Sequence, residues 1–216
     1  MFAKEEYRRI QAECKDHATL CVVSKKHSVQ EIQEAYDLGQ RIFGENRVQE
    51  LLEKAPQLPK DIEWHFIGHL QRNKVRQVLP LLSCIQSLDS LRLAQVIEQE
   101  AAAINKTISC LLEFHLALED TNKTGLRKEE ARAMLEACAS FPHIHVEGIM
   151  AMGPHTEDDA EIRAVFEEGF QLYESLRTVD PSLQILSMGM SDDYPIALEA
   201  GSNLIRIGSR LFLQEV

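Results

Sequence analysis

The fold class follows from one stretch, LCVVSKKHSVQEIQEAYDLG (residues 20–39), because it holds both kinds of segment found along the chain. Its first part is a short apolar run, which is typical of a strand buried on both faces. Its second part is amphipathic and begins at Ser28, with Glu31 three residues later as in a capping box. Gly39 can end this helix in the left-handed conformation. The stretch therefore predicts a strand followed by a helix.

The same alternation of short apolar runs and longer amphipathic segments continues along the chain. The short runs are LCVVSK from Leu20, RIFGEN from Arg41, EWHFIG from Glu63, CIQSLD from Cys84, SCLLEFHLAL from Ser109, HVEGIMAM from His145, ILSMG from Ile185 and NLIRIGS from Asn203. Strands that alternate with helices predict parallel strands joined by crossover helices, and eight such units in about 200 residues match a single α/β (β/α)8 TIM barrel. The alternative is an open doubly wound sheet, but the chain has neither a G-x-G-x-x-G turn nor a G-x-x-x-x-G-K-[ST] loop.

We expect one domain, residues 1–216, because no Ser/Gly-rich or Pro-rich linker divides the chain. The last unit is short, since only RLFLQEV follows Ser209. A helix from about Lys4 to Cys14, within residues 1–18, is expected to pack on the barrel and cover the gap that this short unit leaves.

Composition and charge exclude several classes of protein. The chain has 34 acidic and 23 basic residues and a formal net charge of −11, which disfavours general binding of nucleic acid. No run reaches the ~18 apolar residues of a membrane helix, and the N-terminal residues lack the apolar core of a secretory signal. Five cysteines without a C-x-x-C pair favour reduced thiols in a cytoplasmic protein and no metal site.

Two lysines follow the first strand, at the end of the barrel where βα loops carry the chemistry. Lys25 and Lys26 are neighbours, and both like charge and burial lower the pKa of an amine. A free amine can form a Schiff base with a carbonyl group. Side chains alternate along a strand, so at most one of the two lysines faces the pocket. Both could instead reach solvent at the mouth of the barrel.

The loops after strands 7 and 8 are the usual phosphate site of such barrels. Here they contain Ser187 with Gly189, and Gly208 with Ser209. Glycine lets backbone N–H groups approach a phosphate and serine adds a hydroxyl donor, although ordinary turns would also use these residues. Arg206 lies inside the last apolar run and needs an acceptor, which could be a ring nitrogen, a carboxylate, a phosphate or an internal ion pair.

Taken together, the residues resemble the pyridoxal phosphate homeostasis proteins, which are similar to the barrel domain of alanine racemase (fold-type III of the pyridoxal phosphate proteins). The matching segments are VVSKKHS around Lys25, IFGENRVQE around Asn46, EWHFIGHLQRNK around His65, NKTG at 122–125, EGIMAM at 147–152, LSMGMSDD from Leu186 and AGSNLIRIGSRLF from Ala200. They span the chain from about residue 20 to 212.

The resemblance implies roles for individual residues. It implies that Lys25 forms the Schiff base with pyridoxal 5′-phosphate and that Arg206 faces the ring nitrogen. It further implies that Asn46 lies near the ring, towards its phenolic edge. The phosphate is expected to contact four residues, namely Ser187, Gly189, Gly208 and Ser209.

The assignment of Arg206 favours a carrier over an enzyme. The cofactor ring withdraws electrons best when an acidic partner keeps its nitrogen protonated, and arginine cannot accept a proton. As the family comparison implies, racemases of this fold take a second base from a C-terminal domain, whereas this chain ends at Val216. We expect a protein that binds, stores and delivers pyridoxal 5′-phosphate without efficient catalysis.

Two other functions stay open. One is a weak amino-acid racemase or lyase that uses the same cofactor, and the other is a Schiff-base aldolase that uses Lys25 without a cofactor. The expected partners of a carrier are pyridoxal phosphate and the apoenzymes that receive it, and the expected state is a monomer or a weak dimer.

The remaining polar motifs favour structural roles. His65 is expected in the core or behind the pocket rather than at its mouth. Asp192 and Asp193 precede a helical segment and favour capping over magnesium binding. Lys123, in the loop after strand 5, could steer an anionic cofactor towards an acidic protein or simply lie on the surface.

Overall fold

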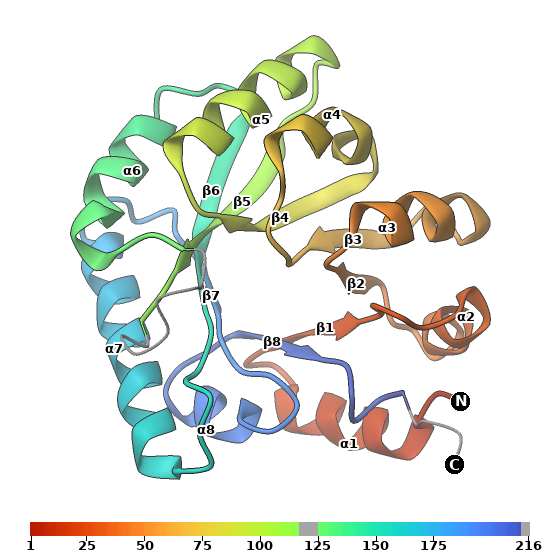
Figure 1. Ribbon diagram of the computed structural model, residues 1–216. Coiled ribbons are helices and arrows are strands. Elements are labelled where there is room, and N and C mark those ends of the chain that lie inside the picture. The colour runs from red at the N-terminus through yellow and green to blue at the C-terminus, as the bar shows by residue number, and fades with distance from the viewer. Residues whose placement is uncertain (117–124, 213–216) are drawn as a thin grey trace.

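The computed structural model describes residues 1–116 and 125–212. Within these ranges, parallel strands form a closed barrel in the order β1 to β8 (Figure 1). The strands are β1 Thr19–Val23, β2 Ile42–Glu45, β3 Glu63–Phe66, β4 Leu82–Leu88, β5 Ile108–Phe114, β6 Ile144–Ala151, β7 Ile185–Ser187 and β8 Leu204–Ile207. Each of the eight predicted apolar runs overlaps one of these strands, so the (β/α)8 prediction is confirmed and the open sheet is excluded.

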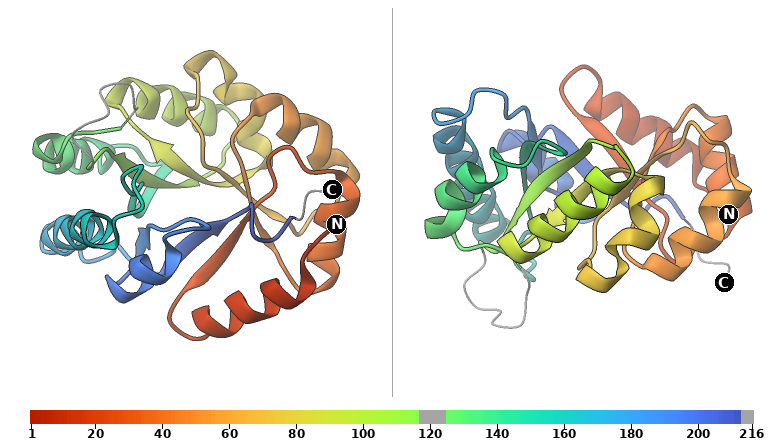
Figure 2. Two further views of the ribbon diagram at one scale, coloured as in Figure 1. Left: turned by 60° about the horizontal axis from the view of Figure 1, so that its bottom comes forward. Right: turned by 90° about the horizontal axis from the view of Figure 1, so that it is seen from above.

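Helices surround the barrel on its outside, as the two views of Figure 2 show. They are α1 Lys4–Cys14, α2 Val29–Asp37, α3 Val48–Lys54, α4 Val75–Val78, α5 Leu91–Ala103, α6 Ala131–Cys138, α7 Asp159–Arg177 and α8 Tyr194–Glu199. The predicted capping box is present at α2, where the Ser28 hydroxyl accepts from the backbone N–H of Glu31 and the Glu31 carboxylate accepts from that of Ser28. Gly39 follows this helix with a φ of +101°, as predicted.

The N-terminal helix α1 packs against the rest of the chain. Helix α1 buries Tyr7, Ile10 and Cys14 in the core. The chain just before it pairs with the segment after β8, because Phe2 bridges Phe212 and their rings lie 5.2 Å apart. The short last unit is thus completed by residues from the start of the chain.

The interior of the barrel is mostly apolar, with a few buried polar side chains near the carboxyl ends of the strands. All five cysteines are buried and unpaired. In residues 1–116 and 125–212, we find no helix with the length and apolar character that crossing a membrane requires.

Candidate functional site

A cavity of about 470 Å³ lies at the carboxyl ends of the strands, where this fold places its chemistry. Its volume falls within the range of about 300–1,000 Å³ that is usual for small-molecule sites. Residues from seven of the eight strand ends contribute to its wall. The lining residues are Val23, Lys25, Asn46, Ile67, Gly68, His69, Glu113, Met150, Met152, Met190, Ser191, Asp192, Arg206, Gly208 and Ser209.

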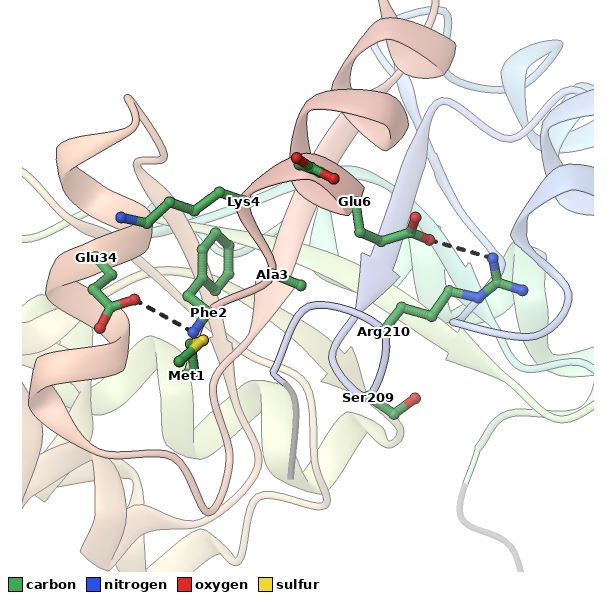
Figure 3. A pocket seen from close by; sticks show the side chains of 9 residues that line it. Met1, Phe2, Ala3, Lys4, Glu6, Glu34, Ser209 and Arg210 are labelled. Atoms are coloured by element: carbon green, nitrogen blue, oxygen red, sulfur yellow. Dashed lines mark hydrogen bonds and ion pairs between the residues drawn. The ribbon is translucent and has the colours of Figure 1, made fainter. Parts of the chain in front are cut away.

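A larger hollow of about 980 Å³ lies beside the N-terminal residues and does not involve Lys25 or Arg206 (Figure 3). Its polar contacts are the ion pair of Glu6 with Arg210 and the hydrogen bond from the backbone N–H of Phe2 to Glu34. The strand-end cavity is the one that holds the predicted site.

Of the two neighbouring lysines, Lys25 lines the cavity and Lys26 does not. Lys26 has a φ of +65°, so the chain turns directly after Lys25. Lys25 is exposed, which matches the alternative that its side chain reaches solvent at the mouth of the barrel. The amine therefore stands at the mouth of the cavity, in contact with solvent.

A buried network of polar groups holds the loop that carries Lys25. The Lys54 ammonium lies 2.8 Å from Glu45 Oε1, 2.8 Å from Glu50 Oε2 and 2.9 Å from the backbone oxygen of Ser24. The Ser24 hydroxyl also donates to Glu45, and the backbone N–H of Lys26 donates to Glu50. Both neighbours of Lys25 are thus tied to this network, which fixes the backbone from which the amine projects.

Arg206 forms part of the cavity wall and is held from behind by its own acceptors. Only 4% of the residue is exposed. Its Nη1 donates to the Ser187 hydroxyl over 2.6 Å, and its Nη2 donates to the backbone oxygen of Ala151 over 3.1 Å. Burial lowers the pKa of Arg206 from its usual value, but a guanidinium in a protein keeps its proton. The site therefore has a fixed cation with N–H donors.

Ser187, which accepts from Arg206, is the first member of a chain of hydrogen bonds across the barrel. The Ser187 hydroxyl donates to Gln86 Oε1 over 2.7 Å, and Gln86 Nε2 donates to His65 Nδ1 over 2.9 Å. Burial lowers the pKa of His65 to about 4, so the imidazole is neutral at physiological pH and can accept at Nδ1. The prediction that His65 lies in the core is confirmed, since it is 6% exposed.

Two residues predicted to hold a phosphate lie outside the cavity wall. Ser187 is fully buried and its hydroxyl already bonds to Gln86 and Arg206, so it positions the guanidinium instead. Gly189 has a φ of +93°, and a Cβ there would lie 2.6 Å from Ala197, which shows a tight turn against α8. Gly208 and Ser209 do line the cavity. The β7–α8 loop contributes Ser191, a buried residue that the sequence reading missed.

Asn46 follows β2 and belongs to the same cavity wall. Its Oδ1 is buried and has no hydrogen-bond partner among the described residues. Gly68 packs so closely against it that a Cβ on Gly68 would lie 2.6 Å from the backbone oxygen of Asn46. The unpaired oxygen marks a position at which a ligand group can bind.

Glu113, on β5, is a second cavity residue that the sequence reading missed. It is 3% exposed, and burial, assisted by the negative charge of Asp89, raises its pKa to about 7. Arg206 opposes this shift only in part. The only signal in the sequence was a lone acidic residue inside the apolar run SCLLEFHLAL.

The other polar residues have structural contacts or lie elsewhere. His69 pairs with Asp89 over 3.0 Å at the cavity rim. Asp193 precedes α8 but makes no side-chain cap, because its carboxylate accepts from the backbone N–H of Met190; the capping prediction is wrong in this respect. Lys123 and the rest of residues 122–124 fall outside the described residues. No cluster of three metal-binding side chains occurs in the described parts of the chain.

Comparisons with known proteins agree with this architecture. The sequence model of the family "Alanine racemase, N-terminal domain" matches residues 3–215. A pyridoxal phosphate homeostasis protein of Helicobacter pylori is 39% identical over 196 residues, which cover 89% of this chain and 86% of the relative. The same protein of Aquifex aeolicus is 38% identical and covers 90% and 86% of the two chains.

Solved structures show the same fold. The structure of PipY of Synechococcus elongatus with PLP bound has a TM-score of 0.89 and 33% identity, over 97% of this chain and 99% of that chain. An alanine racemase of Clostridium difficile has a TM-score of 0.81 at 13% identity, over 98% of this chain and 56% of the racemase. At that identity the racemase shows the fold alone.

Proposed function

This chain belongs to the pyridoxal phosphate homeostasis protein family, and we propose that it binds pyridoxal 5′-phosphate through Lys25 in order to store and deliver it. The observation that carries the proposal is that Lys25, Arg206 and the Gly208–Ser209 turn line one cavity. PipY, whose structure was solved with PLP bound, shares the barrel over nearly its whole length.

The residues on the cavity wall fit this ligand. When bound, pyridoxal phosphate supplies an aldehyde that condenses with an amine and a ring that withdraws electrons from the attached carbon. Lys25 offers the amine at the mouth. Gly208, Ser209 and Ser191 offer backbone N–H groups and hydroxyls for the phosphate, in place of the Ser187 and Gly189 that the sequence suggested. Arg206 offers N–H donors for the ring nitrogen.

We further propose that the protein is a carrier without efficient catalysis. Arg206 is anchored by Ser187 and Ala151 and keeps its charge, so it cannot hand a proton to a ring nitrogen. Chemistry that depends on a protonated ring is therefore disfavoured. The exposed amine of Lys25 suits exchange of the ligand with apoenzymes in the cytoplasm, where five buried free thiols stay reduced. Such exchange requires no stable oligomer, and we propose a monomer or a weak dimer.

Lys25→Ala tests the attachment, with Lys26→Ala as the matched control on the next residue. Each protein is mixed with pyridoxal 5′-phosphate, reduced with borohydride and digested, and the modified peptide is identified by mass spectrometry. We expect a visible absorbance band and a label on Lys25 in the wild type and in Lys26→Ala, and loss of both in Lys25→Ala. An undiminished band in Lys25→Ala would overturn the assignment.

A second measurement separates the carrier from its alternatives. Steady racemase or lyase turnover by the purified protein on any amino acid would refute the carrier and support the weak enzyme. A protein that never develops the absorbance band, but whose Lys25 is trapped by borohydride with a plain carbonyl substrate, would instead be a Schiff-base aldolase.

A further inference from the structure

Glu113 presents an unpaired acid group to the cavity. It lies near the end of β5, is 3% exposed and belongs to the cavity wall. Its Oε2 is buried and has no hydrogen-bond partner among the described residues. A buried oxygen without a partner is costly, so a group that binds in this cavity and pairs with it is favoured.

The charges around Glu113 make its ionised form costly. Burial is the largest cause of its raised pKa of about 7, and the carboxylate of Asp89 adds to it. Arg206 is the one charge that favours the anion among the causes of this shift. The other ionisable groups on the cavity wall are Lys25 after β1, His69 after β3 and Asp192 after β7. His115 follows β5 two residues after Glu113 but is not part of the wall.

The chemistry of the proposed ligand determines which form of Glu113 can bind it. The phosphate oxygens, the phenolate oxygen and a ring nitrogen that faces an arginine are all acceptors. An ionised carboxylate is also only an acceptor, and two of these ligand groups carry negative charge. A neutral carboxylic acid, by contrast, has one O–H donor. Only the neutral acid can form a favourable hydrogen bond with such a ligand.

We propose that Glu113 is a ligand-binding residue that acts as a neutral acid, so that binding of pyridoxal phosphate takes up one proton from solvent. The proton is added to the Glu113 carboxylate, and the resulting O–H donates to an acceptor of the ligand. This inference rests on the proposed function, and it adds that ligand binding is coupled to protonation of Glu113. It makes retention of the ligand depend on pH in the physiological range.

The expected pH dependence of the affinity follows from the fraction of protein whose Glu113 is neutral, which is the form competent to bind. With a pKa of about 7 in the free protein, half of the molecules are competent at pH 7 and about 1% at pH 9, so affinity falls about 50-fold over this interval. The phosphate ester titrates near pH ~6 and contributes little above pH 7. Near pH 8 the Glu113 carboxyl should take up about 0.9 proton for each ligand, which is measured as the difference in proton uptake between the wild type and a variant without this carboxyl.

The test uses 4-deoxypyridoxine 5′-phosphate, which has the ring and the phosphate but no aldehyde, so that titration of Lys25 does not affect a covalent step. Affinity is measured calorimetrically from pH 7 to pH 9 in buffers of different ionisation enthalpy, which gives the number of protons taken up. The variant is Glu113→Gln, whose amide keeps a donor at every pH. The control is Glu147→Gln on the neighbouring strand β6, where Glu147 bonds to Ser109 outside the cavity wall.

We expect a large loss of affinity with pH for the wild type and for Glu147→Gln. For Glu113→Gln we expect less than about a threefold loss and no proton uptake. The same pH dependence and proton uptake in Glu113→Gln as in the wild type would overturn the inference while leaving the binding function intact. If neither this probe nor pyridoxal 5′-phosphate binds the wild type, the proposed function fails, and this inference fails with it.

Discussion

Lys54→Met should destabilise the protein strongly, because it leaves the carboxylate of Glu45 buried without its cation. Glu45 is 0% and Lys54 8% exposed, and their charged atoms lie 2.8 Å apart. Removing one partner of a buried ion pair costs about 3–5 kcal/mol, whereas an exposed pair contributes only about 0–1 kcal/mol. We therefore expect Lys54→Met to lower the free energy of unfolding by about 3–5 kcal/mol at pH 8.

The pH dependence of this loss has a defined sign. Burial already raises the pKa of Glu45, and Lys54 is the main group that opposes the shift. Without Lys54 the folded protein holds this proton more tightly than the unfolded chain does, so stability decreases as pH rises above the unfolded pKa of about 4.5. The difference between wild type and variant should thus be larger at pH 8 than at pH 5.

Urea unfolding at both pH values checks this prediction. Arg132→Met, which removes an exposed ion pair with Glu136, is the control and should cost less than about 1 kcal/mol. Adding Glu45→Gln to Lys54→Met should recover much of the lost stability. A loss below about 1 kcal/mol for Lys54→Met, or an equal loss at both pH values, would refute the reasoning, because the pair would then be effectively in water.

Three further predictions concern the cavity wall and Ser187, which lies behind it. Ser187→Ala removes an acceptor of Arg206, so unfolding experiments should show a loss of about 1–3 kcal/mol, and titration should show weaker binding of pyridoxal phosphate with its attachment to Lys25 preserved. Gly68→Ala places a Cβ 2.7 Å from the Cβ of Asn46, and it should lower both thermal stability, by about 1–3 kcal/mol, and ligand affinity. In the ligand-free protein, Glu113→Gln should match the wild type in stability near pH 4 and exceed it by up to about 3 kcal/mol at pH 8, because the wild-type carboxyl must ionise in a buried site; equal urea midpoints at pH 8 would contradict this.

The sequence predicted the barrel well because its strands are buried on both faces. Such strands appear as short continuous apolar runs, and each predicted run overlaps a strand of the structure. Differences occur at the boundaries, such as β4, which begins at Leu82 rather than Cys84. The boundary depends on pairing with the neighbouring strand, and Leu82 pairs with Trp64 on β3. That pairing cannot be read from the local sequence.

Site residues could be predicted where their position relative to a strand end was enough to place them. Lys25 is the second residue after β1, so its place at the cavity could be inferred from the fold alone. Ser187 does not line the cavity, because it is the last residue of the three-residue strand β7 and is fully buried. The partner that holds Ser187 there is Gln86, which is 101 residues away in the sequence. A contact of this range has no signal in a single sequence.

The cavity wall combines the permanent positive charge of Arg206 with the carboxyl group of Glu113, whose charge depends on pH. Arg206 is held by a chain of hydrogen bonds that crosses β8, β7, β4 and β3 and ends at the neutral imidazole of His65. Nothing in that chain titrates near neutral pH, since burial lowers the pKa of His65 to about 4. Glu113 faces the same cavity from β5 with a pKa of about 7. A catalyst gains from a permanently polarised ring, whereas a carrier must both hold and release its ligand. The proposed roles, a constant guanidinium that orients the ligand and a carboxyl whose proton sets how tightly it is held, meet the second requirement better than the first.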